Sequence, residues 1–215
     1  MNWMTGGSAS RRDVLGMLFV LLCTGVARAD RIDDGGGNFT FDIAAPNPYT
    51  SSLTATGGAY VAFDADAQQV VNLGSWATRV NSDGYTVTLN GGSVMHNQLS
   101  TGLYVGANAT INNSGTVQSD LGTAIYSTFT TSTTNTAGGT IDGGTFAIYQ
   151  TGAGIVDNAG LIQSTGGTGV YVATSPSVSF LNRNGATINA HVGVSFDSAP
   201  SSWINQGQIT GANAS

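Results

Sequence analysis

Residues 110–128, TINNSGTVQSDLGTAIYST, decide the fold, because the same pattern returns in residues 154–174 as GIVDNAGLIQSTGGTGVYVAT. In both copies an Asn is followed by a small residue and Gly, then by an aliphatic residue four positions after the Asn. An aliphatic–Tyr pair follows twelve and thirteen positions after the Asn. The equivalent residues are Asn113, Val117, Ile125 and Tyr126 in the first copy and Asn158, Ile162, Val170 and Tyr171 in the second. Three shared offsets indicate a structural repeat.

The repeat has one period along the chain. Successive Asn positions are separated by 23, 22, 23, 24 and 23 residues, and an aliphatic position aligned independently is separated by 22, 23, 22 and 24 residues. A period in this range is typical of solenoid proteins. The Asn positions are Asn90, Asn113, Asn135, Asn158, Asn182 and Asn205, and the aliphatic positions are Leu103, Ile125, Ile148, Val170 and Val194.

The residues of each unit indicate which kind of solenoid forms. Short β-prone runs such as residues 102–105, 147–150 and 169–173 alternate with Gly, Asn and Ser, and no unit has the spacing of an amphipathic helix. The leucine pattern of leucine-rich repeats is also absent. The chain is therefore predicted to be all-β, a parallel β-helix with about 22 to 24 residues and three short strands per coil.

Specific roles follow for the repeated residues. The aliphatic positions are expected to fill the interior, and the Asn side chains are expected to stack at a turn, each amide bonding to the next coil. A Gly that follows each Asn is expected to supply a positive φ. A second core ladder is predicted from Val117, Ile141, Ile162, Ile188 and Ile209, and the turn glycines are Gly115, Gly138, Gly160, Gly185 and Gly207.

The tyrosines at Tyr104, Tyr126, Tyr149 and Tyr171 each follow an inward aliphatic position and are therefore expected to point outward. Two interpretations are open. Stacked aromatic rings at one sheet position stabilise neighbouring coils, or an exposed aromatic stripe binds a sugar or a protein. We favour the structural interpretation.

Residues 1–29 are predicted to be a signal peptide. Arg11 and Arg12 precede an apolar run of about 13 residues, shorter than the roughly 20 that span a membrane, and Ala27-Arg28-Ala29 has the form of a signal-peptidase site. The residues around Arg11 and Arg12 are compatible with twin-arginine export as well as with the Sec route. The single cysteine, Cys23, lies in this segment.

The chain after residue 29 is expected to contain two parts. Residues 30–58 are predicted to form an N-terminal cap or irregular segment and residues 59–215 the repeats, which stop in the middle of a unit and are interpreted as truncated. This mature part has no Cys, Lys or Glu and only Arg31, Arg79 and Arg183 as basic residues besides two histidines. Sparse basic residues argue against a nucleic-acid partner.

The units Asn113-Ser-Gly-Thr-Val117, Asn158-Ala-Gly-Leu-Ile162 and Asn205-Gln-Gly-Gln-Ile209 resemble the passenger domains of bacterial autotransporters over about residues 60–215. The resemblance implies a right-handed β-helix on the surface or outer membrane of a Gram-negative bacterium, or secreted from it. It also implies a non-catalytic, adhesin-like or structural role, with a surface protein or glycan as ligand. An outer-membrane translocator barrel would be the further partner, in cis outside this chain or in trans, because no barrel strands occur here.

The alternative is a carbohydrate-active β-helix enzyme, either a polysaccharide lyase or a hydrolase. Such an enzyme needs clustered carboxylates, often with calcium and a basic residue. Asp64 and Asp66 would form a pair if they shared a strand, but no basic residue is near them in the sequence. We assign no catalytic, metal-binding or cofactor-binding residue and expect no cofactor. The other candidate carboxylates are Asp33, Asp34, Asp120, Asp142, Asp157 and Asp197.

Three further patterns are too weak to assign a site. His96 and His191 are about four periods apart, which is roughly 20 Å along a stack of β-coils and too far for one metal ion. The glycine-rich residues 33–38 occur once, whereas calcium-binding repeats of this kind come in several stacked copies. The threonine pairs at 86 and 88 and at 128 and 130 are too irregular for the ranks of an ice-binding solenoid.

Overall fold

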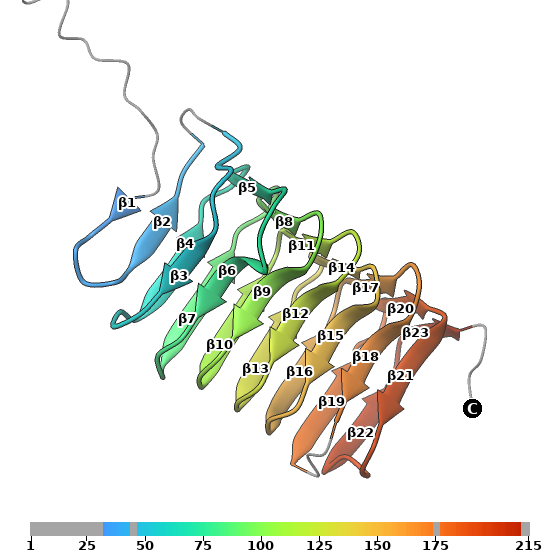
Figure 1. Ribbon diagram of the computed structural model, residues 1–215. Coiled ribbons are helices and arrows are strands. Elements are labelled where there is room, and N and C mark those ends of the chain that lie inside the picture. Colours follow the sequence, from blue (N-terminus) through green and yellow to red (C-terminus); the bar gives the residue numbers. More distant parts are fainter. Residues whose placement is uncertain (1–31, 44–46, 174–176, 212–215) are drawn as a thin grey trace, which may run out of the picture.

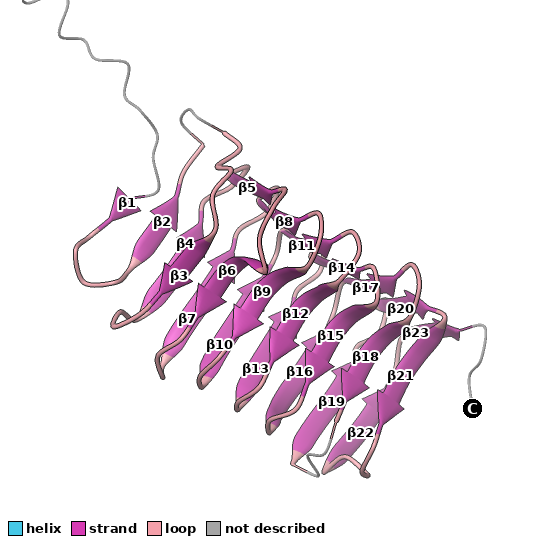
Figure 2. Cartoon of the chain, viewed as in Figure 1, coloured by secondary structure: helices cyan, strands magenta, loops and turns pink. Residues whose placement is uncertain are grey.

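The fold is described by a computed structural model that covers residues 32–43, 47–173 and 177–211. In these ranges every regular element is a β-strand and no helix occurs (Figure 2). The strands stack into a β-solenoid of about seven turns, with paired strands roughly 23 residues apart in the chain (Figure 1). The prediction of an all-β parallel β-helix is confirmed.

Three sheets form the sides of the solenoid. Sheet A contains β1 (Ile32–Asp33), β2 (Phe39–Phe41), β4 (Tyr60–Phe63), β7 (Tyr85–Leu89), β10 (Ala109–Asn113), β13 (Thr131–Asn135), β16 (Gly154–Asn158), β19 (Val178–Asn182) and β22 (Ser202–Asn205). Sheet B contains β5 (Gln68–Val71), β8 (Val94–Asn97), β11 (Thr116–Ser119), β14 (Thr140–Gly143), β17 (Leu161–Ser164), β20 (Thr187–Ala190) and β23 (Gln208–Gly211). Sheet C contains β3 (Leu53–Ala55), β6 (Trp76–Val80), β9 (Thr101–Val105), β12 (Thr123–Ser127), β15 (Phe146–Gln150), β18 (Thr168–Val172) and β21 (Val192–Phe196).

The core is a set of inward ladders, one or more from each sheet. Strand residues alternate between buried and partly exposed positions, as the two faces of a pleated strand require. In sheet C, Leu103, Ile125, Ile148 and Val170 are in register and fully buried, and Val194 continues the row. In sheet B the buried row is Met95, Val117, Ile141, Ile162 and Ile188, followed by the partly buried Ile209. Each such side chain contributes about 1.5–3 kcal/mol of burial free energy.

The stacked sheets begin earlier than residue 59, the boundary that the repeats predict. Strand β2 already pairs in parallel with β4, and β3 pairs in parallel with β6. The part that resembles a cap is the two-residue strand β1, which folds back antiparallel on β2 at the edge of sheet A. The Tyr85 hydroxyl holds the nearby loops, donating to the Gly37 carbonyl at 2.7 Å and accepting from the Gly58 N–H at 2.8 Å. A short antiparallel edge strand offers little backbone for pairing with other chains.

The corner between sheets A and B has two kinds of turn, which alternate from β7 onward. Long turns join Leu89 to Met95, Asn135 to Ile141 and Asn182 to Ile188, and each contains one Gly with positive φ: Gly92 at 79°, Gly138 at 89° and Gly185 at 82°. Short turns join Asn113 to Val117, Asn158 to Ile162 and Asn205 to Ile209.

The glycines of the short turns do not have the positive φ that the sequence pattern predicts. A methyl group on Gly160 would overlap the Gly139 and Thr136 carbonyl oxygens of the preceding long turn. Gly115 and Gly207 are placed in the same way, each against carbonyl oxygens of the coil before it. These glycines are therefore required by the close approach of two coils rather than by backbone conformation.

Replacing Gly160 by Ala is expected to lower the unfolding free energy by about 1–3 kcal/mol, because the added methyl group forces two stacked turns apart. Gly91→Ala is the matched control, since Gly91 lies in a turn of the same corner with ordinary φ and with no atom within 4 Å of an added Cβ. Urea unfolding followed by circular dichroism measures both variants. Equal stability of the two would contradict the close-packing explanation.

Candidate functional site

The Asn side chains form a hydrogen-bonded row at the end of sheet A. Each Nδ2 donates to the Oδ1 of the Asn one coil further on, from Asn113 to Asn135, Asn158, Asn182 and Asn205, at 2.8, 2.8, 2.8 and 2.9 Å. The same amides also donate to backbone carbonyls of the next coil, as Asn135 does to Leu161 at 3.1 Å. All five amides therefore point in one direction along the solenoid.

Asn90 lies outside this row, although the sequence spacing places it there. Leu89 occupies the register position opposite Asn113, and Asn90 is an exposed residue of the following turn. Because the period varies from 22 to 24 residues, it predicts the equivalent position in another coil only to within one residue. In this coil the Asn lies one residue after the position that pairs with Asn113. As a result the buried Oδ1 of Asn113 has no hydrogen-bond partner.

The outer face of sheet C has an aromatic ladder, made of Trp76, Tyr104, Tyr126, Tyr149 and Tyr171. Successive ring centroids are 5.9, 5.4, 5.0 and 5.1 Å apart. The four tyrosines share one register position on consecutive strands. The Tyr126 and Tyr149 rings are stacked at 28°, and the other neighbouring pairs are tilted at 30° to 43°. Each ring thus contacts its neighbour in the next coil, as the structural interpretation predicts.

The two ends of the aromatic ladder carry opposite charges. Arg79 takes the tyrosine position of its coil, with its guanidinium carbon 4.9 Å from the Trp76 ring centre and 5.0 Å from that of Tyr104. At the other end the Tyr171 hydroxyl contacts both carboxylate oxygens of Asp197, at 2.8 and 2.9 Å. This hydrogen bond to Asp197 raises the pKa of Tyr171, and burial, followed by the neighbouring Tyr149 and Tyr104, raises the pKa of Tyr126.

The candidate catalytic carboxylates do not form a cluster. Asp64 and Asp66 lie in the turn after β4 rather than on a shared strand, and Asp66 has a positive φ of 63°. Two other carboxylates are engaged in pairs. Asp157 accepts from Arg183 Nε and Nη2 at 2.7 and 2.6 Å, and Asp120 lies 2.8 Å from His96 Nε2.

No metal centre is found among the residues that the structure describes, where no group of three or more His, Cys, Asp or Glu side chains is placed to hold an ion. The Asp34 carboxylate of the glycine-rich loop accepts hydrogen bonds from Gly36 N at 2.8 Å and from the Asn38 side chain at 2.7 Å. The Asn38 hydrogen bond is the main cause of a lowered Asp34 pKa. This loop is thus held by its own backbone and side chains.

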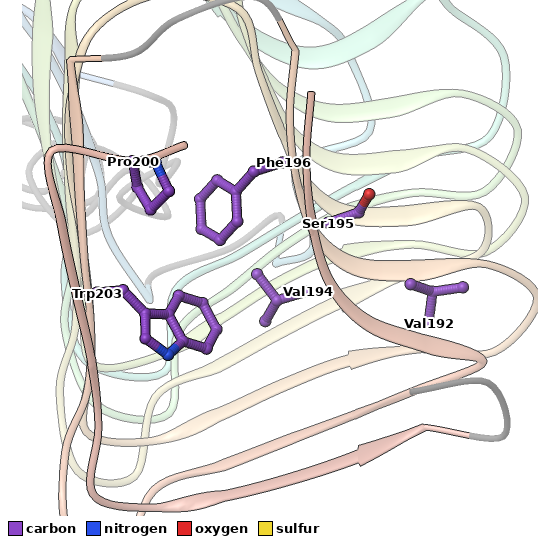
Figure 3. A pocket seen from close by; sticks show the side chains of 6 residues that line it. All are labelled: Val192, Val194, Ser195, Phe196, Pro200 and Trp203. Atoms are coloured by element: carbon purple, nitrogen blue, oxygen red, sulfur yellow. The ribbon is translucent and has the colours of Figure 1, made fainter. Parts of the chain in front are cut away.

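A cavity of about 450 Å³ lies at the last described coil and is open to solvent. Figure 3 shows Val194 and Phe196 of β21 opposite Trp203 of β22, with Pro200 beside them. Trp203 stacks on Phe180 at 4.5 Å and remains 46% exposed. The cavity is therefore a continuation of the inner ladders rather than a separate pocket on the outer surface.

Comparison of the chain with protein-family models, with curated proteins and with solved structures finds no match. In the described ranges, no helix is long and apolar enough to cross a membrane.

Asn158→Ala is expected to lower the unfolding free energy by about 1–3 kcal/mol, because it removes one amide from the buried row, takes away the donor to Asn182 Oδ1 and leaves Asn135 Nδ2 with backbone acceptors alone. Asn112→Ala is the control. Asn112 is the residue before Asn113 on β10, but it is partly exposed on the outer side of sheet A and is not a member of the amide row. Chemical unfolding compares the two variants. A loss of similar size in both would show that the amide row contributes nothing specific.

Alkaline pH is expected to destabilise the protein through the aromatic ladder. The folded-state pKa values of Tyr126 and Tyr171 are raised above 10.0, so the folded state holds these protons more tightly than the unfolded state does. Their contribution to stability is complete below pH 10 and is lost as the pH rises through the raised values.

The raised pKa values that cause this loss of stability are measured by tyrosinate absorbance during a pH titration. Asp197→Asn is expected to lower the Tyr171 pKa by removing the carboxylate that its hydroxyl contacts. Asp120→Asn is the control, since Asp120 contacts His96 and Gln118 instead of a tyrosine. If the Asp197→Asn and Asp120→Asn variants give the same tyrosine titration curve, the Asp197 hydrogen bond is not the cause of the raised Tyr171 pKa.

Proposed function

We propose that this protein is an exported, passenger-type β-helix protein that acts at the cell surface or after secretion, in adhesion or as a structural element. Its outer faces would make the contacts. The observation that carries the proposal is the regular composition of these faces, which present mainly uncharged hydrogen-bonding and aromatic side chains at the same register position over many coils. Solenoids use such extended surfaces for binding.

Sheet B illustrates this composition. One outward row contains an imidazole, two primary amides of Gln, one carboxylate, an Asn and a Thr on consecutive coils. In order along the solenoid these are His96, Gln118, Asp142, Gln163, Asn189 and Thr210. Donors and acceptors spaced at about 4.8 Å match the hydroxyl-rich surface of a glycan or the polar surface of a protein.

Sheet A has a second face of this kind. Thr86, Thr110 and Ser132 are in register on three neighbouring strands, and Thr88, Asn112 and Thr134 form the parallel row. Threonines that look irregular along the sequence thus come together in the fold. Over these coils the face carries no charge, which suits an uncharged ligand better than an ionic one.

Export is supported by the predicted signal peptide of residues 1–29, which lie outside the described residues. The surface location is supported by the resemblance of the Asn-x-Gly-x-aliphatic units to autotransporter passengers. On this proposal an outer-membrane translocator barrel is the partner for export.

Expression of the full chain in a Gram-negative host tests the proposal. We expect a processed N-terminus at Asp30 and a product that is degraded by protease added to intact cells or is recovered from the medium. Beads coated with this product should adhere to cells or to a glycan array. Retention in the cytoplasm contradicts the proposed export, no adhesion contradicts the adhesive role, and release of reducing sugar from polysaccharides would favour the carbohydrate-active enzyme.

A further inference from the structure

The aromatic ladder has a feature that stacking alone does not require: its rings are all oxidisable and its two ends differ in charge. A tryptophan and four tyrosines follow one another at centroid distances of 5.0 to 5.9 Å, over five consecutive strands of sheet C. The row ends where Ser195 takes the register position of the tyrosines. Indole and phenol rings are the side chains that lose a single electron most readily apart from thiols, and the mature chain has no thiol.

When one ring of the ladder has lost an electron, the charges at the two ends determine at which ring this electron vacancy has the lowest free energy. The Arg79 guanidinium lies about equally close to the Trp76 and Tyr104 rings and opposes positive charge there. The Asp197 carboxylate lies against Tyr171 and favours positive charge at that ring. Opposite charges at short range stabilise each other and like charges repel. The vacancy therefore has lower free energy at the Tyr171 end.

Asp197 also supplies the proton acceptor that oxidation of a phenol requires. Of the four ladder tyrosines, Tyr171 has a hydroxyl that donates to a carboxylate, whereas the structure shows no hydrogen bond from the hydroxyls of Tyr104, Tyr126 and Tyr149 to other described residues. A base within hydrogen-bond reach of the proton is the geometry that proton transfer needs. Tyr171 is thus the ring of the ladder at which oxidation and deprotonation are coupled within the protein.

We infer that the aromatic ladder is a one-electron relay that carries oxidation from Trp76 to Tyr171. An external one-electron oxidant removes an electron from Trp76 and is itself reduced. Electrons then move from Tyr104 to Trp76, from Tyr126 to Tyr104, from Tyr149 to Tyr126 and from Tyr171 to Tyr149. Each intermediate tyrosine releases its proton to water when it is oxidised and regains one when it is reduced.

The last step leaves a neutral radical on Tyr171. The phenolic O–H bond breaks, the electron passes to Tyr149, and the proton passes along the hydrogen bond to Asp197, which becomes a carboxylic acid. The inference is independent of the proposed adhesive role, because it concerns the rings of sheet C and needs no ligand.

A tethered photo-oxidant tests the relay in the full chain. Leu73 is 83% exposed and lies three residues before Trp76, so Leu73→Cys in a Cys23→Ser background gives one attachment point for a ruthenium polypyridyl complex. Laser excitation with a cobalt(III) quencher produces ruthenium(III), and a nitroso spin trap followed by peptide mass spectrometry locates the protein radical. We expect the trapped radical mainly on Tyr171.

Tyr126→Phe combined with Tyr149→Phe keeps the stacked rings but removes two oxidisable members, so most of the Tyr171 adduct should be lost. Asp197→Asn should spread the adduct over the other tyrosines. Tyr60→Phe, which changes a tyrosine of sheet A, is the control and should change nothing. The inference is overturned if the parent protein gives no Tyr171 adduct, or if the double variant gives as much as the parent while its circular dichroism spectrum is unchanged.

Discussion

The structure depends on the in-register parallel pairing of each strand with the strand one coil away. Once a register is chosen, every residue has an equivalent above and below it, so each side chain is repeated as a row about 4.8 Å apart. An aliphatic row becomes a continuous core, and a buried amide can bond to the next amide. A ring in such a row stacks on its neighbour. The amide row of sheet A makes this register specific, because a shift by one residue would place aliphatic or exposed side chains against the buried amides.

The repeated residues predict much of this arrangement because a solenoid converts sequence period directly into spatial proximity. Ile125 and Ile148 are neighbours in the core because they are one period apart, and the same holds for Tyr126 and Tyr149. The period does not determine which of two adjacent residues belongs to a given row. Asn90 and Leu89 are both compatible with the spacing, and the strand register places Leu89 in the row.

Other features depend on contacts that leave no repeated pattern. The pairing of β2 with β4 could not be predicted, because residues 39–41 contain neither the repeated Asn nor the aliphatic–Tyr pair that mark the later coils. Tyr171 and Asp197 meet because a strand end lies beside the tyrosine row, and a single aspartate gives no periodic signal. The same holds for Arg183 and Asp157, whose ion pair joins neighbouring coils. Candidate sites in a solenoid are thus predictable where they repeat and unpredictable where they occur once.

The alternation of long and short turns at the corner between sheets A and B has a consequence for how such a chain lengthens. The true repeating unit at this corner is two coils, since a short turn with its close-packed Gly160 lies against the long turn that contains Gly138 and Gly139. Duplication of one coil between β10 and β23 would place two turns of the same kind together, whereas duplication of two coils preserves the alternation of long and short turns. Length variation in this part of the solenoid is therefore expected in steps of two coils.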